Sequence, residues 1–83
     1  MRIHASAFKH DIAEVDIEHA WTNAISYFDI GPDNDPPKSL AIGPDNAGNV
    51  LELLYLQLED DDLIIHAMPL RDVFARFLTG EDQ

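Results

Sequence analysis

Residues 50–58, VLELLYLQL, decide the fold of this chain. Successive side chains of a β-strand point to opposite faces, and here both alternating sets of positions are mainly apolar. One set holds Leu51, Leu53 and Tyr55, and the other holds Leu54, Leu56 and Leu58. This pattern predicts a central strand that is covered on both sides.

Neighbouring runs supply the partners of this strand. Residues 63–68, LIIHAM, follow after three aspartates, and a short acidic turn between two apolar runs predicts an antiparallel hairpin. Residues 39–43, SLAIG, predict a preceding strand, which the turn residues 44–49 close onto the central one. Together they predict a β-meander, with residues 27–30 as a brief further strand.

Helical periodicity flanks the meander. From Glu14 onward, apolar residues recur every three or four positions and predict the main helix: Ile17, Ala20, Trp21, Ala24, Ile25 and Phe28. Residues 3–10 suit an edge strand or a short helix, and we expect a short helix that Asp11 ends in the left-handed conformation. A last helix is predicted with Pro69 at its first position and Gly80 as its C-terminal cap, and its apolar stripe is expected to pack on the sheet.

The expected architecture is a single α+β domain spanning residues 1–83. It comprises an antiparallel β-meander of three to four strands, N-terminal helices and a C-terminal helix packed on the sheet. This length is near the lower limit at which a single hydrophobic core stabilises a domain without disulfides or a bound metal. A homodimer or a partner complex is therefore expected rather than a lone monomer.

Charge and composition exclude several classes of function. Sixteen acidic residues against five lysines and arginines give a net charge of -11, which disfavours unassisted nucleic-acid binding and favours either a basic protein partner or simple solubility. The absence of cysteine excludes disulfides and thiolate zinc sites. Residues 1–6 lack the apolar run of a signal peptide and no segment has the apolar length of a membrane span, so we expect a cytoplasmic protein without membrane contact.

A few polar residues interrupt the apolar pattern. His66 lies inside the LIIHAM run, where an imidazole is either a hydrogen-bonded core residue or a functional group. Arg71 could bind an anion, or it could pair with Asp72 or with the chain end. Tyr55 is expected opposite or diagonal to His66. Lys38 opens a strand and is solvated by default.

Glu52 is the charge inside the central strand. It lies either in water near a sheet end, which we expect, or in a functional pair with a base. His4, His10 and His19 show no metal-binding spacing, and neither a phosphate-binding glycine loop nor a GxSxG nucleophile motif is present. We therefore expect no metal and no cofactor.

Several short motifs carry a family resemblance. Residues 9–12, KHDI, and 16–21, DIEHAW, resemble the start of the small BrnT-type toxins of the RelE superfamily, and the likeness continues at residues 40–45, 48–52 and 64–71. It spans residues 9–78. The chain departs from the family pattern at Asp11, where the family has a turn glycine, and at Met68, where it has an arginine.

The resemblance implies a twisted antiparallel sheet flanked by helices, and a metal-independent messenger-RNA endoribonuclease that an antitoxin neutralises. In such chemistry, basic or tyrosyl side chains activate the ribose 2′-hydroxyl, hold the phosphate and protonate the leaving oxygen. By position, the resemblance implies catalytic roles for His66, Arg71, Tyr55 and Lys38. The alternative is a non-catalytic module of the same fold that binds proteins through its acidic surface, which the net charge and Met68 favour.

Overall fold

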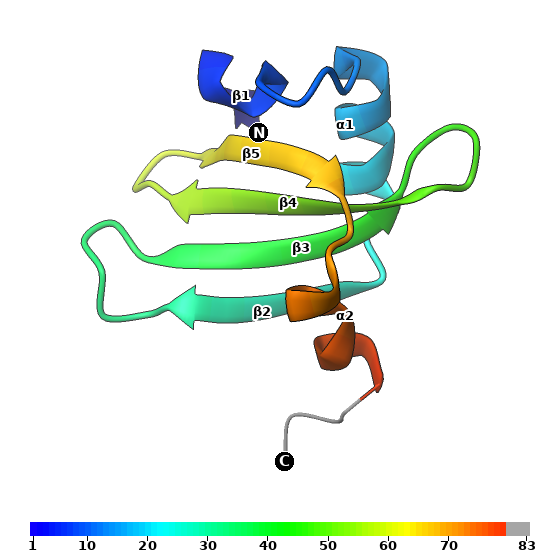
Figure 1. The fold of residues 1–83 in the computed structure, drawn as a ribbon. Helices are drawn as coiled ribbons and strands as arrows, with labels where there is room; N and C mark the ends of the chain where they lie inside the picture. The colour runs from blue at the N-terminus through cyan, green and yellow to red at the C-terminus, as the bar shows by residue number, and fades with distance from the viewer. Residues whose placement is uncertain (80–83) are drawn as a thin grey trace.

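The chain forms one sheet flanked by helices in a computed structural model that describes residues 1–79 (Figure 1). The strands are β1 (Arg2–Ile3), β2 (Ser26–Gly31), β3 (Lys38–Pro44), β4 (Val50–Gln57) and β5 (Asp62–Pro69). The helices are the short 3-10 helix η1 (Ala5–Phe8), α1 (Glu14–Thr22) and α2 (Asp72–Thr79). This arrangement confirms the α+β class.

The strand order in the sheet is β1-β5-β4-β3-β2. Both predicted hairpins, β3–β4 and β4–β5, are antiparallel, and β4 is the central strand as expected. The predicted number of strands, three to four, was too low, since the sheet has five. It is also mixed, because Arg2 and Ile3 pair in parallel with Leu63 and Ile64 at the edge.

The predicted helix boundaries need three corrections. The main helix ends at Thr22, because the chain then turns into β2 and the N–H of Ile25 donates to the carbonyl of Ile42 (2.8 Å). Phe28, which was expected in the helix, therefore lies in β2. Residues 3–10 divide into the end of β1 and η1, although Asp11 has the expected left-handed φ of 62°. Pro69 ends β5 instead of starting α2, and the expected cap at Gly80 lies outside the described residues.

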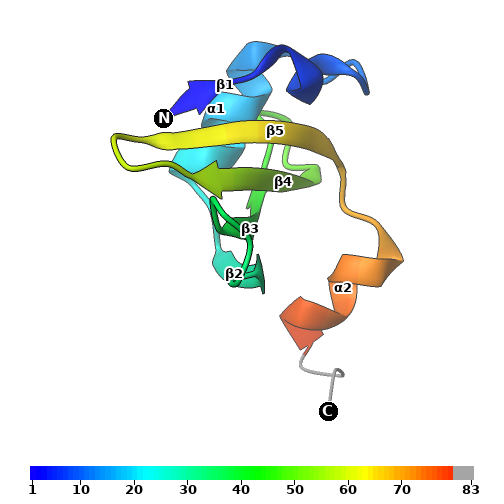
Figure 2. The ribbon, with the colours of Figure 1, turned by 90° about the vertical axis from the view of Figure 1, so that its left-hand side faces the viewer.

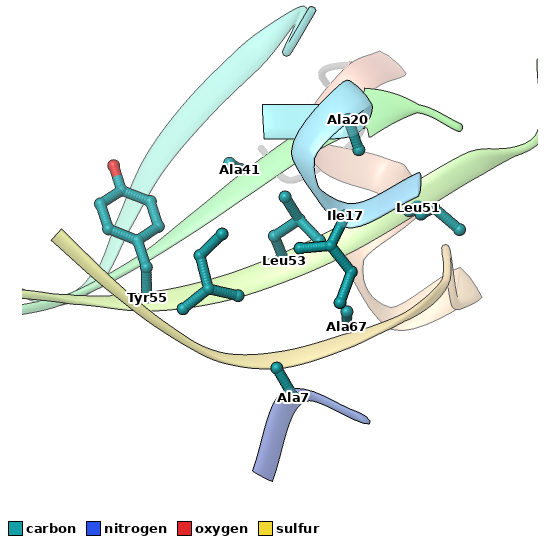
Figure 3. Packing of buried hydrophobic residues seen from close by; sticks show 9 residues of the cluster. Ala7, Ile17, Ala20, Ala41, Leu51, Leu53, Tyr55 and Ala67 are labelled. Carbon is teal, nitrogen blue, oxygen red and sulfur yellow. The ribbon is translucent and has the colours of Figure 1, made fainter. Parts of the chain in front are cut away.

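The main core lies between α1 and one face of the sheet. Ile17 and Ala20 of α1 pack on this face, and Figure 3 shows Ile17 directed toward the strands that carry Leu53 and Ala67. A Cβ at Gly43 would overlap the carbonyl oxygen of Ala20. Glycine at this position therefore allows α1 to approach β3 closely.

The other face of the sheet is less completely covered. Leu53 and Tyr55 of β4 are buried under α1, whereas Leu54 and Leu56 on the opposite face are half-buried. On that side α2 reaches the sheet through Phe77, whose ring centroid lies 4.8 Å from that of Phe28, and it stands at a distance from β4 and β5 (Figure 2). The predicted cover of β4 is thus complete on the α1 side, whereas on the other side it is complete at Glu52 and partial at Leu54 and Leu56.

Neither α1 nor α2 combines the length and the apolar composition that crossing a membrane requires, within residues 1–79.

Leu53 and Leu54 offer a matched test of this difference in burial. We expect Leu53→Ala to lower the free energy of unfolding by about 2–5 kcal/mol, because it removes a side chain that is 0 % exposed. Leu54→Ala should cost clearly less, since this side chain already contacts solvent. Urea denaturation of both variants measures the difference, and equal losses would mean that the two faces are covered alike.

Candidate functional site

The carboxylate of Glu52 is the centre of a polar cluster on the face of the sheet opposite α1. Its side chain is 0 % exposed, and its oxygens accept hydrogen bonds from His66 and from both the backbone and the guanidinium of Arg71. The expectation that Glu52 lies in water was wrong. These donors replace the water that a buried carboxylate loses, so the charge can remain in the middle of an apolar strand.

Arg71 reaches Glu52 because the chain turns back across β4 after β5. The N–H of Leu70 donates to Val50 (3.0 Å), and the next N–H, that of Arg71, donates to Glu52 Oε1 (2.9 Å). From the side chain, Nη2 donates to Oε2 (2.7 Å) and Nε lies 3.0 and 3.2 Å from the two oxygens. A guanidinium has five N–H groups, and this one is 46 % exposed, so it can still bind an external anion.

A β-bulge directs His66 toward this cluster. Without a bulge, Ile64 and His66 would point to the same face. The register between β4 and β5 shifts so that Leu54 pairs with His66 and Tyr55 pairs with Ile64, which leaves Ile65 as the extra residue. Ile64 therefore stays buried under α1 while His66 points to the opposite face, where Nε2 lies 2.9 Å from Glu52 Oε2.

A second imidazole, that of His10, lies against His66. The two ring centroids are 5.3 Å apart, with an edge-to-face angle of 74°. The segment that carries His10 is fixed to the bulge, because Ser6 Oγ donates to the carbonyl of Ile65 (2.7 Å). His10 is exposed and His66 is 19 % exposed, so this pair is accessible from solvent.

Glu52 is ionised at neutral pH. Burial raises the pKa of Glu52, but the hydrogen bonds from Arg71 and His66 outweigh it, and the pKa lies below its usual value. Because an ionised carboxylate only accepts hydrogen bonds, His66 Nε2 must carry the proton that it shares with Glu52. When the ring is neutral, this arrangement leaves the lone pair on the other ring nitrogen, Nδ1.

The four residues that the resemblance singled out do not form one group. His66 and Arg71 meet at Glu52, whereas Tyr55 lies on the α1 face, where burial raises its pKa and its ring packs 4.9 Å from that of Trp21. Lys38 pairs with Leu56, four positions along β4 from Glu52 and so about 13 Å away. Catalytic roles for Tyr55 and Lys38 stay predictions that this geometry does not favour.

Two residues of the cluster were missed from sequence. A single carboxylate between apolar strand residues was the available signal for Glu52, and it was interpreted as an exposed sheet end. His10 lies within a motif of the resemblance but was considered only as a metal ligand. Among residues 1–79, no group of histidine and acidic side chains has the arrangement of a metal site.

Two hollows on the surface are lined by residues outside the cluster. One hollow is lined by Met1, Ile3, Phe8, Glu14 and Glu18. The other is lined by Asp35, Pro36, Pro37, Gln57, Leu58 and Glu59. His66 and Arg71 line neither of them, and a ligand would reach the cluster through the exposed parts of these two side chains, 19 % and 46 %.

Comparison with known proteins yields no relative, since no protein-family model, no curated protein and no solved structure matches the chain. The resemblance to BrnT-type toxins therefore stays a prediction, and the chemistry of the cluster must be argued from its own geometry.

Glu52→Gln tests the buried charge. We expect this variant to lose about 1–3 kcal/mol of unfolding free energy at pH 7, because Arg71 and His66 lose a charged acceptor. The folded-state pKa lies below the usual 4.5, so the stabilisation by Glu52 is present above about pH 4.5 and is lost as the pH falls through the folded value. The difference between wild type and variant should therefore shrink on acidification.

Urea denaturation at pH 7 and at successively lower pH measures this difference. Glu18→Gln, which changes an exposed carboxylate of α1, is the matched control and should differ little from wild type at any pH. A difference between wild type and Glu52→Gln that does not change with pH would contradict an ionised Glu52.

Proposed function

We propose that this protein is a metal-independent endoribonuclease that acts on messenger RNA in the cytoplasm and is neutralised by an antitoxin. The observation that carries the proposal is the pair of solvent-accessible imidazoles, His10 and His66, beside the exposed guanidinium of Arg71. Two proton-transfer groups and one phosphate-binding group are what cleavage of RNA through its own 2′-hydroxyl requires.

The two histidines divide the proton transfers. One imidazole accepts the proton of the ribose 2′-hydroxyl while the 2′-oxygen attacks phosphorus, and the other gives a proton to the departing 5′-oxygen. The products are a 2′,3′-cyclic phosphate and a 5′-hydroxyl, and one proton is taken up for each one released. His66 can serve in either step through Nδ1, because its Nε2 is held by Glu52.

Arg71 and Glu52 have different roles in this scheme. Arg71 stabilises the charge that builds on the phosphate oxygens, with the N–H groups that do not face Glu52. Glu52 is 0 % exposed and cannot touch RNA, so it is a positioning residue. Its carboxylate fixes both the imidazole of His66 and the guanidinium of Arg71, which reduces the reorganisation that binding the phosphate would require.

The acidic composition does not exclude RNA at this site. At physiological salt, charges separated by more than about 8 Å across solvent are largely screened, so the local groups dominate. The local cations here are Arg71 and Lys9, which precedes His10 in the sequence, and the local carboxylates are Glu52, which is paired with Arg71, and the sequence neighbours Asp11 and Asp72. Binding should nevertheless be weak, because the net charge of -11 still opposes the approach of a polyanion.

His66→Gln separates catalysis from folding. A glutamine amide can still donate to Glu52, but it cannot exchange protons near neutral pH, so the variant should stay folded and lose about 10²–10⁴-fold in cleavage rate. Cleavage of an end-labelled RNA is followed with EDTA present, and the cyclic phosphate is identified on the product. His10→Gln should show a loss of similar size.

His19→Gln is the matched control, because His19 lies on α1, on the other side of the sheet, where its Nδ1 is 2.8 Å from the carbonyl oxygen of Pro44 and a glutamine amide can donate to the same oxygen. It should cleave RNA at the wild-type rate. No cleavage by a folded wild-type protein, loss of cleavage in EDTA, or an unchanged rate in His66→Gln would each contradict the proposal.

A second function, that of a non-catalytic module which binds a basic protein, is favoured by the net charge of -11. Such binding would place opposite charges in contact and weaken steeply with salt. A partner recovered from the native host at low salt should therefore be basic and should dissociate as the salt concentration rises. Recovery of neutral or acidic partners alone would contradict this function.

A further inference from the structure

We propose that the outer edge of β2 binds an extended, basic segment of a partner protein, which adds to the sheet as a sixth strand. This proposal makes the second function concrete and is independent of RNA cleavage. β2 ends the strand order, and within residues 1–79 no strand pairs with its outer side (Figure 1). Its outward backbone N–H and C=O groups are thus available to another chain.

The α1 side of this edge is suited to a cationic side chain. Tyr27 and Asp29 both point to this side, because they pair with Ala41 and Ser39 of β3. Tyr27 is 55 % exposed, and its ring is held edge-to-face against Trp21, with centroids 6.2 Å apart. A guanidinium that stacks on Tyr27 could also pair with the carboxylate of Asp29, two positions along the strand.

The carboxylate of Asp29 is fixed before any partner arrives. Ser39, whose side chain is buried, donates from Oγ to Asp29 Oδ1 (3.1 Å) and accepts from Gln57 Nε2 (2.6 Å). An exposed aspartate at a strand edge would otherwise be mobile. This orientation reduces the entropy that a guanidinium must overcome when it binds.

The opposite side of the same edge is apolar. Phe28 points there, and its ring packs on Phe77 of α2. A strand that is added beside β2 sends alternate side chains to the two sides. The segment that fits should therefore alternate basic residues, which meet Tyr27 and Asp29, with apolar residues, which meet Phe28 and Phe77.

Two features define the length and the identity of the occupant. The register of β2 and β3 shifts between Asp29 and Gly31, so regular pairing extends from Ser26 to Asp29 and the added strand is short. A second copy of this chain would bring another charge of -11 and another Asp29 to the edge. Like-charge repulsion disfavours that pairing, whereas a basic segment relieves it.

The test uses a synthetic hexapeptide that alternates arginine and valine, with an alternating glutamate and valine hexapeptide as its counterpart. Backbone amide shifts of the full-length protein are followed by NMR during titration. The basic peptide should shift the amides of residues 25–29 and those of the facing β3, and the acidic peptide should shift none of them. Asp29→Lys should weaken binding by about tenfold or more, and Tyr27→Ala should weaken it as well.

Glu14→Lys is the matched control, since it makes the same change in net charge on α1, beside Ile3 of the opposite edge strand. It should bind the basic peptide as the wild type does. Equal weakening by Asp29→Lys and Glu14→Lys would overturn the proposal in favour of non-specific attraction. Shifts that map to α1 instead of β2 would overturn the β2 assignment while leaving binding by the acidic surface intact.

Self-association is the remaining outcome that would overturn the proposal. Amide shifts in residues 25–29 that depend on protein concentration without peptide, together with a dimer mass by sedimentation, would mean that a second copy occupies the edge. None of these measurements involves RNA, so their failure is distinguishable from failure of the nuclease proposal.

Discussion

Burial of the Glu52 carboxylate is the constraint on which the polar side of this protein depends. A charge with 0 % exposure in the middle of β4 is tolerated only if donors surround it, and they come from two different segments. One donor, Arg71, lies in the turn that links the sheet to α2, and the other, His66, lies on the neighbouring strand β5. The charge therefore fixes where α2 begins as well as how the exposed groups of the site are oriented.

The bulge at Ile65 reconciles two incompatible demands on β5. The core requires Ile64 and Ala67 under α1, and the cluster requires His66 on the other face, which a regular alternation cannot satisfy. One extra residue resolves the conflict. The carbonyl of Ile65 then accepts from Ser6, so the same irregularity that turns His66 also anchors the segment that brings His10 to it.

The periodicity of apolar residues was sufficient to predict the regular parts of the fold, but not its irregular parts. The central strand, both hairpins and the start of α1 follow from alternation and helical spacing, which are local properties. The parallel pairing of Arg2 and Ile3 and the early end of α1 depend on contacts distant in the sequence, so no local pattern indicates them. His66 and Arg71 were selected from sequence, but their grouping with Glu52 depended on a bulge that the residues alone do not reveal.

The two proposed surfaces use opposite charges and lie on different parts of the sheet. The cluster of Arg71 and the imidazoles faces away from α1 near β5, whereas Tyr27 and Asp29 face the α1 side of the β2 edge. A basic segment bound at β2 would cancel part of the net charge of -11 without covering the cluster. The added strand would lie three strand spacings, roughly 14 Å, from β4. Salt largely screens charges at that distance, so a partner at β2 would leave the electrostatic surroundings of Arg71 nearly unchanged, and each surface can be occupied without the other.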